Sequence, residues 1–322
     1  MRVLVTGGAG FLGTALVEAL AARGDEPIAF DAGVTPALRR AAERRRGVVI
    51  ALGDIADMAS VCRVVRGERP DAVIHGAAIV GVPASLGSPA NVFRVNLGGT
   101  INLFEAMELY DLRRVIHISS EDTYGPFQAD VATEDHPQNP LYAYGIAKLA
   151  VEHLGRTYRL THGIECINLR ASWVYGPDLP RPRVPRDLIE AAVDGRPLHL
   201  PSGGDSAIDH TYVDDFVAGT LRALDHAEHP HDAYNLGSGT APTLFEMVET
   251  VRELVPGADL SIGPGAYRHG GTTPVPRKGA LDCTRARETF GYAPRFDLRA
   301  GLAATIDARR RRRAGQQGGG GG

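Results

Sequence analysis

The sequence predicts an α/β protein: a doubly wound parallel sheet of the Rossmann type with a smaller C-terminal substrate-binding lobe. Three observations lead to this prediction. Short apolar runs alternate with longer amphipathic runs, a glycine-rich turn follows the first apolar run, and the alternation is lost after Arg170. Parallel strands need long crossover connections, so this alternation predicts a mostly parallel sheet that is covered by helices on both faces.

The first half of the chain supplies most of the expected sheet. Arg2–Thr6 is a continuous apolar run typical of a buried parallel strand, and Phe11–Arg23 is a helical pattern that Gly24 ends. Further strands are expected at Pro27–Asp31, Val48–Leu52, Asp71–His75, Val115–Ser119 and Ile164–Arg170. Helices between them are expected at Thr35–Arg46, Met58–Arg66, Ala90–Leu109 and Ala143–Thr161.

The second half has shorter elements. The proline-rich stretch Pro177–Pro185 indicates a loop or lid, and Gly263–Pro276 is rich in glycine and proline and is expected to be irregular. Ala233–Leu236 is a further strand candidate. Helices are expected at Arg186–Asp194, Val213–Asp225, Leu244–Leu254 and Leu298–Arg313.

Composition excludes several classes of protein. The 322 residues carry a net charge of −3, with 43% hydrophobic and 23% charged residues, which argues against global disorder and against a basic nucleic-acid surface. No apolar run approaches the ~20 residues of a membrane helix, and the first strand pattern begins at Arg2, which leaves no room for a leader. The cysteines, Cys62, Cys166 and Cys283, are odd in number and far apart, which favours a reducing cytoplasm.

Two charged features are expected to be solvated surface. The arginine run Arg309–Arg313 suits the negative C-terminal end of a helix better than a nucleic-acid patch. The histidines His226, His229 and His231 lie near a proline in a polar stretch, so no metal site is predicted.

The glycine-rich turn Thr6–Gly13 predicts a dinucleotide site. It follows the first strand and opens the first helix, which is the order that this fingerprint requires. Gly7 permits the tight turn, Gly10 lets backbone N–H groups approach a pyrophosphate, and Gly13 lets helix and strand pack closely. The helix N-terminus, with Phe11, Leu12 and Gly13, would then face the phosphates.

A carboxylate at the end of the second strand predicts which dinucleotide is bound. Asp31 lies 18 residues after Gly13, where a carboxylate accepts hydrogen bonds from a ribose 2′-hydroxyl and repels a 2′-phosphate. No arginine is adjacent, so NAD is favoured over NADP. Weaker signals for cofactor contact follow the third and fourth strands, at Asp54 and Ile55 and at Gly76, Ala77 and Ala78.

A tyrosine and a lysine at helical spacing predict the catalytic pair. Lysine occurs twice in the chain, and Lys148 lies four residues after Tyr144, on the same helical face. A cation about 4 Å from the phenol would lower its pKa of about 10 by about three units as an upper estimate. The phenolate would then act as a general base toward a substrate hydroxyl. Tyr142 lies on another face of the helix.

The segment after the fifth strand adds further candidates. Ser120 is placed to hydrogen-bond the reacting oxygen and to stabilise its developing charge. The adjacent carboxyls of Glu121 and Asp122 form an acid pair, which is either a solvated or capping pair or an acid–base pair for removing water.

Together these residues resemble the extended short-chain dehydrogenase/reductases, specifically the NAD-dependent epimerase/dehydratase family. The resemblance covers about residues 1–305 and rests on Thr6–Gly13, Asp31, Gly53-Asp54, His75–Ala78, Asn96–Thr100, Ser119–Gly125, Tyr144–Lys148, Arg170–Pro177 and Tyr212–Asp215. It implies a catalytic set of Ser120, Tyr144 and Lys148, with Glu121 and Asp122 as the acid pair in an order reversed from that usual in the dehydratases. It also implies that Asn96 lies near the cofactor and a homodimer through Ala90–Leu109 and Ala143–Thr161.

The resemblance has departures at the substrate. Trp173 and Ile208 stand where many members carry an Asn and an Arg that hold a nucleotide diphosphate. The expected substrate residues are Ser120, Tyr144, Trp173, Arg183 and Arg277. The resemblance favours sugar epimerase-type chemistry. The alternative is an NAD-dependent dehydrogenase of a free sugar, sugar acid or small polyol, and a minor one is a non-catalytic NAD-binding module.

The expected domains follow from these assignments. Residues 1–174 plus about 208–238 form the NAD-binding Rossmann domain. Residues from about 175–207 plus 239–313 form the substrate-binding lobe, and 314–322 form a disordered glycine-rich tail. The expected partner is a small, sugar-like hydroxylated substrate, with no nucleic acid and no membrane.

Overall fold

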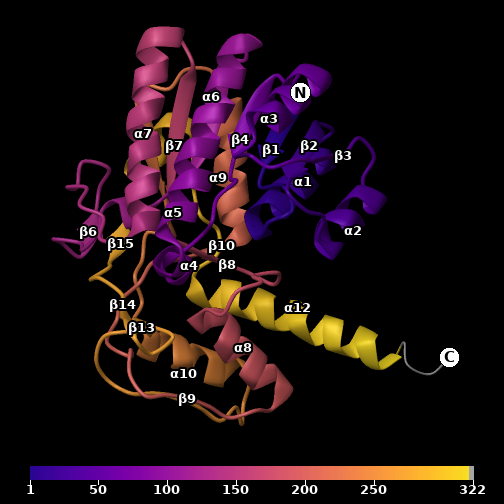
Figure 1. The fold of residues 1–322 in the computed structure, drawn as a ribbon. Helices are drawn as coiled ribbons and strands as arrows, with labels where there is room; N and C mark the ends of the chain where they lie inside the picture. The colour runs from indigo at the N-terminus through magenta and orange to yellow at the C-terminus, as the bar shows by residue number, and fades with distance from the viewer. Residues whose placement is uncertain (319–322) are drawn as a thin grey trace.

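A parallel seven-stranded sheet forms the centre of the computed structural model, which describes residues 1–318 (Figure 1). The strands run in the order β11-β7-β5-β4-β1-β2-β3, and every neighbouring pair is parallel. Their bounds are β1 (Arg2–Thr6), β2 (Glu26–Asp31), β3 (Val49–Leu52), β4 (Ala72–His75), β5 (Arg114–Ser120), β7 (Glu165–Ala171) and β11 (Ala233–Leu236). The predicted doubly wound α/β fold is confirmed, because the strand order reverses between β1 and β4.

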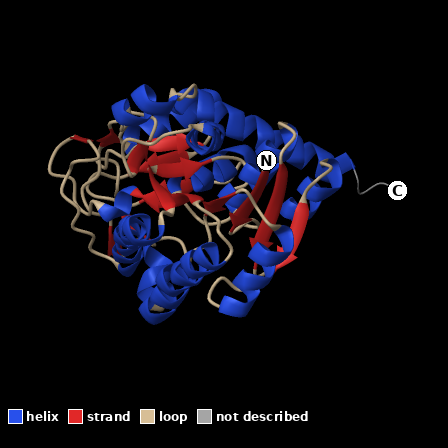
Figure 2. Cartoon of the chain, turned by 90° about the horizontal axis from the view of Figure 1, so that it is seen from above, coloured by secondary structure: helices blue, strands red, loops and turns tan. Residues whose placement is uncertain are grey.

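Helices cover both faces of this sheet (Figure 2). One face carries α1 (Phe11–Ala22), α2 (Pro36–Arg44) and α9 (Val213–Asp225), and the other carries α3 (Met58–Glu68), α6 (Gly99–Leu109) and α7 (Ala143–His162). The first strand is apolar on both sides. In β1, Val3 and Val5 pack into the first core and Leu4 into the second, as the alternation of side chains along a strand requires.

The segment between β4 and α6 differs in part from its prediction. The predicted helix Ala90–Leu109 is present as one unbroken helical run, in which α5 (Pro89–Val92) passes through the π-helical turn η1 (Phe93–Gly98) into α6. The short helix α4 (Val82–Gly87) before it was not predicted. Prolines at the first turns of α4 and α5 suit helix starts, because they lack the N–H that a helix interior needs.

A second group of elements lies beyond the C-terminal edge of the sheet (Figure 1). The strand β9 (Leu198–Leu200) pairs with β12 (Leu260–Ile262), and α8 (Val184–Asp194), α10 (Leu244–Leu254) and α12 (Leu298–Gly318) pack around them. The predicted loop Pro177–Pro185 ends inside α8, which begins two residues before the expected start. The remaining elements are β8 (Trp173–Tyr175), β10 (His210–Tyr212), β6 (Val131–Ala132), β15 (Ala280–Leu281), α11 (Thr284–Phe290) and the 3₁₀ turn η2 (Glu121–Thr123).

The expected irregular segment Gly263–Pro276 contains a small hairpin. Its strands are β13 (Arg268–His269) and β14 (Thr273–Pro274), and they pair antiparallel. The hairpin places His269 against the aromatic ring of Trp173, with the ring centroids 5.5 Å apart.

The C-terminal helix extends beyond the predicted end at Arg313, to Gly318. Within its arginine run, Arg309 pairs with Asp194 at 3.0 Å and Arg312 with Asp178 at 2.7 Å, so part of the run anchors α12 to the α8 region. The end of the predicted glycine-rich tail, residues 319–322, lies outside the described residues. No helix in the described part of the chain is long and apolar enough to cross a membrane.

Candidate active site

A cavity of about 590 Å³ lies at the C-terminal edge of the sheet, at the point where the strand order reverses. This is where open parallel sheets bind ligands, because the loops after β1 and β4 diverge there. Most of the predicted site residues line this one cavity. They are Gly7, Gly10, Phe11, Leu12, Gly13, Asp31, Asp54, Ile55, Gly76, Ala77, Ala78, Ser120, Asp122, Tyr144, Lys148, Trp173 and Arg183.

The glycine-rich loop is shaped by backbone contacts that a side chain would block. A Cβ at Gly13 would lie 2.0 Å from the carbonyl oxygen of Gly7, and Gly7 itself has a φ of +71°, which favours glycine. Gly10 is the N-cap of α1 and supplies no side-chain cap. The first N–H groups of α1 therefore face the cavity as donors for an anion, which fits a dinucleotide pyrophosphate.

Asp31 closes the other end of this loop. Its Oδ2 accepts a hydrogen bond from the Ala9 N–H at 3.0 Å, so the carboxylate at the tip of β2 is held against the loop after β1. The same carboxylate lines the cavity, where it fits a ribose hydroxyl.

Asn96 has a different place from the predicted one, because it lies outside the cavity lining. From the π-helical turn, its side-chain oxygen accepts from the Ile79 N–H at 2.7 Å and its amide donates to the Ile79 carbonyl at 3.0 Å. Ile79 lines the cavity, so Asn96 positions the segment after β4 rather than contacting the cavity itself.

Tyr144 and Lys148 enter the cavity from the first turns of α7, beside Ser120 at the end of β5. The Lys148 ammonium donates to the Ile118 carbonyl at 2.5 Å and lies 3.3 Å from Nε2 of His117. His117 is buried and burial lowers its pKa well below the usual value, so it stays neutral beside the lysine. Burial also lowers the pKa of Lys148 to about 8.

The prediction that Lys148 lowers the pKa of the Tyr144 phenol is wrong. Burial raises the pKa of Tyr144 to about 12, and the negative charge of Asp122 acts in the same direction. The groups that favour the phenolate are Arg181, Ser120 and Arg183. Lys148 is not among the groups that shift the pKa of this phenol, and its ammonium donates to the Ile118 carbonyl.

The acid pair separates into two different environments. Asp122 lines the cavity, whereas Glu121 is 1% exposed and points into the protein. Lys278, which the sequence did not single out, lies between them, 2.8 Å from Asp122 and 3.1 Å from Glu121. Burial raises the pKa of Glu121 to about 7, whereas Lys278 outweighs burial at Asp122 and lowers the pKa of that carboxyl.

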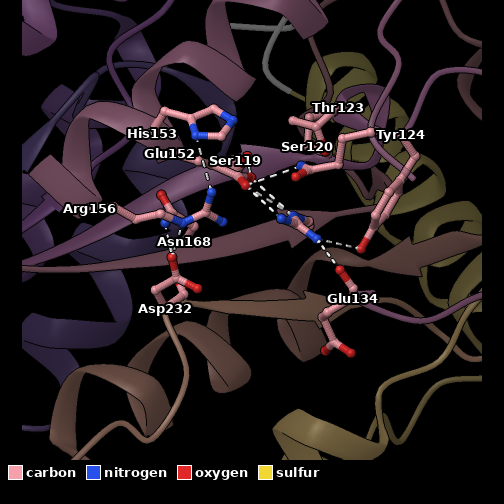
Figure 3. Close-up of polar contacts among 12 residues, drawn as sticks. Ser119, Ser120, Thr123, Tyr124, Glu134, Glu152, His153, Arg156, Asn168 and Asp232 are labelled. Atoms are coloured by element: carbon pink, nitrogen blue, oxygen red, sulfur yellow. Dashed lines mark hydrogen bonds and ion pairs between the residues drawn. The ribbon is translucent and has the colours of Figure 1, made fainter. Parts of the chain in front are cut away.

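A buried polar network supports the floor of the site (Figure 3). On β7, the Arg170 guanidinium donates to both oxygens of Glu152, at 3.1 Å and 2.7 Å, and to the phenol oxygen of Tyr124 at 3.0 Å. Ser119 donates to the same Glu152 carboxylate at 2.6 Å. Arg170 and Glu152 are almost fully buried, and a single buried charge would destabilise the fold. Each of the two therefore neutralises the charge of the other.

The substrate end of the cavity is aromatic and cationic. The Arg183 guanidinium lies over the Trp173 ring at 4.1 Å, and His269 stacks on the same ring with the ring centroids 5.5 Å apart. Arg181, which the sequence analysis did not select, also lines this end. Arg277 does not lie where it was predicted. It pairs with Asp130 and half of its side chain is exposed, because its segment runs along the outer side of β6.

Comparisons with known proteins agree with this architecture. A model of the NAD-dependent epimerase/dehydratase family matches residues 3–237. The chain belongs to the NAD-dependent epimerase/dehydratase family. The predicted family, the enzyme class and the NAD cofactor are therefore confirmed, whereas the roles of individual residues stay predictions.

Two curated relatives cover nearly the whole chain. A UDP-glucose 4-epimerase of Mycolicibacterium smegmatis is 31% identical over 95% of this chain and 98% of its own length. A dTDP-glucose 4,6-dehydratase of Neisseria meningitidis serogroup B is 30% identical over 95% of this chain and 92% of its own. A solved structure of UDP-glucose 4-epimerase from Thermotoga maritima with UDP-glucose matches with a TM-score of 0.87, at 29% identity, over 97% and 99% of the two chains.

Proposed function

We propose that this family member oxidises a secondary hydroxyl of a sugar-like substrate by hydride transfer to NAD, and that Tyr144, Lys148 and Ser120 carry out the step. One observation carries the proposal: the phosphate loop, Asp31 and this trio all line one continuous cavity. A relative solved with NAD, the UDP-glucose 4-epimerase of Thermus thermophilus, matches with a TM-score of 0.84 at 30% identity.

The residues of the chain divide the work along the cavity. The N-terminus of α1 holds the pyrophosphate, and Asp31 accepts from the adenosine ribose. When bound, NAD supplies a hydride acceptor and a positive nicotinamide ring. That positive ring would add to Arg181 and Arg183 in favouring the Tyr144 phenolate against burial, which raises the pKa of the phenol. The phenolate would then take the hydroxyl proton, Ser120 would hydrogen-bond the same substrate oxygen, and Lys148 would hold the nicotinamide ribose.

Sugar epimerase-type chemistry, in which hydride returns to the other face of the oxidised carbon, is the first candidate for the step after oxidation. Both the family and the UDP-glucose 4-epimerase relatives support it. Loss of water through an acid pair is disfavoured, because Glu121 faces away from the cavity and only Asp122 lines it. Lys278 also holds Asp122 in its charged form, which is unsuited to protonating a leaving hydroxyl.

The second candidate function is that of a dehydrogenase of a small substrate, and two residues of the chain favour it. Trp173 is packed at the substrate end beneath Arg183, and Ile208 is fully buried, so neither position offers a polar contact to a diphosphate. Burying a diphosphate would cost several kcal/mol unless other groups of the cavity, such as the arginines Arg181 and Arg183, replaced these contacts.

We propose that two copies of the chain associate through α6 and α7. These helices pack side by side on one face of the sheet (Figure 1) and expose apolar side chains to solvent. The exposed positions are Ile101, Leu109, Ile146 and Leu160. Sedimentation velocity of the wild type and of Ile146→Glu tests the interface: a dimer that dissociates in the variant supports it, and a monomeric wild type refutes it.

We place the reaction in the cytoplasm. The three cysteines are free, and Cys166 is buried with its pKa raised by burial, so it is an unreactive thiol. Free thiols throughout a chain are typical of a reducing compartment.

The experiment that tests the proposed function starts with the purified protein. Mass spectrometry after denaturation shows whether NAD is released, and a panel of free and nucleotide-linked sugars is then followed by the absorbance of reduced nicotinamide and by product analysis. Retained NAD with an epimeric product supports the first candidate. Exchangeable NAD with accumulation of reduced nicotinamide supports the second. A chain that binds no NAD, or that oxidises no member of the panel, contradicts the proposal.

A further inference from the structure

Within residues 1–318, two guanidinium groups at the substrate end form no ion pair with a carboxylate. Arg181 and Arg183 come from the proline-rich segment before α8, and both line the cavity. Nη1 of Arg183 is buried and has no hydrogen-bond partner among the described residues. Asp122 is the one carboxylate whose charge acts on either guanidinium, and Asp122 is already paired with Lys278 at 2.8 Å.

The charges at this end of the cavity are therefore unbalanced. Arg181, Arg183 and Lys278 are three cations, and they face Asp122 and the neighbouring Glu121, whose pKa burial raises to about 7. Each arginine also repels the other, since the charge of Arg181 acts to lower the pKa of Arg183. A pair of guanidinium groups without carboxylates is the arrangement that binds an oxyanion, because the planar fork donates two parallel hydrogen bonds.

The position of the pair limits what the anion belongs to. Arg181 and Arg183 line the same cavity as Tyr144, and the charges of both act on its phenol. Trp173 also lines the cavity, with the Arg183 guanidinium over its ring. Trp173 is stacked on His269, with the ring centroids 5.5 Å apart, and meets the edge of Tyr267 at 6.1 Å. An anion held by these two guanidinium groups would therefore lie close to the reacting carbon.

We propose that Arg181 and Arg183 form a carboxylate subsite, so that the substrate is a sugar acid whose carboxylate pairs with them while its hydroxyl reaches Tyr144. The inference rests on the proposed function and adds the class of substrate. It assigns a role to Arg181, and it names a carboxylate as the partner of Arg183. The Arg183 guanidinium is already stacked on Trp173, which holds its planar fork in one orientation for the bidentate contact.

Calorimetric binding with NADH present tests the subsite without turnover. The probes are D-glucuronate and D-galacturonate, each against its neutral sugar, D-glucose or D-galactose. The wild type is expected to bind at least one uronate about tenfold or more tighter than the matched neutral sugar. Arg181→Gln/Arg183→Gln is expected to abolish this preference. The control Arg196→Gln, an exposed arginine just after α8 and outside the cavity, is expected to keep it.

Three results would overturn the proposal. The first is equal binding of the acidic and neutral sugars, and the second is a uronate preference that survives in the double variant. The third is that UDP binds tighter than both uronates and that the double variant weakens UDP binding. The last result would assign the arginines to a diphosphate. Circular dichroism and the affinity for NADH, measured on each variant, show that the fold and the cofactor site are intact. The proposed function fails separately, through loss of NADH binding or absence of sugar oxidation in the wild type.

Discussion

Replacing Glu121 by Gln is expected to remove a pH-dependent part of the stability. The carboxyl is 1% exposed, and burial raises its pKa from an ordinary value of 4.5 to about 7. Between these two values the native state holds a proton that the unfolded state has released, so stability falls as the pH rises. At about 1.4 kcal/mol per pKa unit, the loss amounts to about 3 kcal/mol and is complete above about pH 7.

The assay is urea unfolding of the wild type and Glu121→Gln at about pH 5 and about pH 8. The wild type should lose about 2–3 kcal/mol more stability than the variant between these conditions, because the amide does not titrate. Glu249→Gln, which changes an exposed carboxylate in an i,i+3 pair, should follow the wild type. Equal pH dependence in the wild type and Glu121→Gln would refute the reasoning, since Glu121 would then be charged throughout or solvated.

Two further substitutions test the floor of the site and the choice of cofactor. Glu152→Gln leaves the buried Arg170 charge without its carboxylate and should lower the free energy of unfolding in urea by about 3 kcal/mol. A loss below about 1 kcal/mol, which is the loss expected for the control Glu249→Gln, would contradict the buried network. Asp31→Ser removes the carboxylate acceptor at the ribose, so NADH binding should weaken about tenfold while NADPH binding improves. Fluorescence titration measures both affinities, and an unchanged ratio between them would contradict the role of Asp31.

Local patterns predicted the parts of the site that lie within one strand–turn–helix unit. The glycine-rich loop and Asp31 lie at the ends of predicted strands, and Tyr144 and Lys148 share a predicted helical face. In a doubly wound sheet these positions meet at the carboxyl ends of the strands, which is why they line one cavity. The direction of a side chain is a different matter. Lys148 turns toward the Ile118 carbonyl because a buried ammonium needs an acceptor, and no spacing rule contains that information.

Contacts between distant segments could not be predicted. Lys278 reaches Asp122 across 156 positions in the sequence, and its rarity as one of two lysines was the only available signal. Arg181 lies in a stretch that the prolines marked only as a loop or lid. Arg277 was selected as a cation for the substrate, but it pairs with Asp130 and lies outside the cavity lining. Such pairings depend on tertiary packing, which local periodicity does not encode.

The most direct test of the central claim is the turnover of Tyr144→Phe against that of Tyr142→Phe on a substrate identified by the sugar panel. Tyr142 bonds the Pro274 carbonyl at 2.9 Å and lies outside the cavity lining, so it serves as the matched control. Loss of the proton acceptor should lower the rate of nicotinamide reduction by about 100-fold or more in Tyr144→Phe, with NAD affinity within about twofold of the wild type. Turnover by Tyr144→Phe at the rate of the control would contradict the claim that this phenol takes the substrate proton.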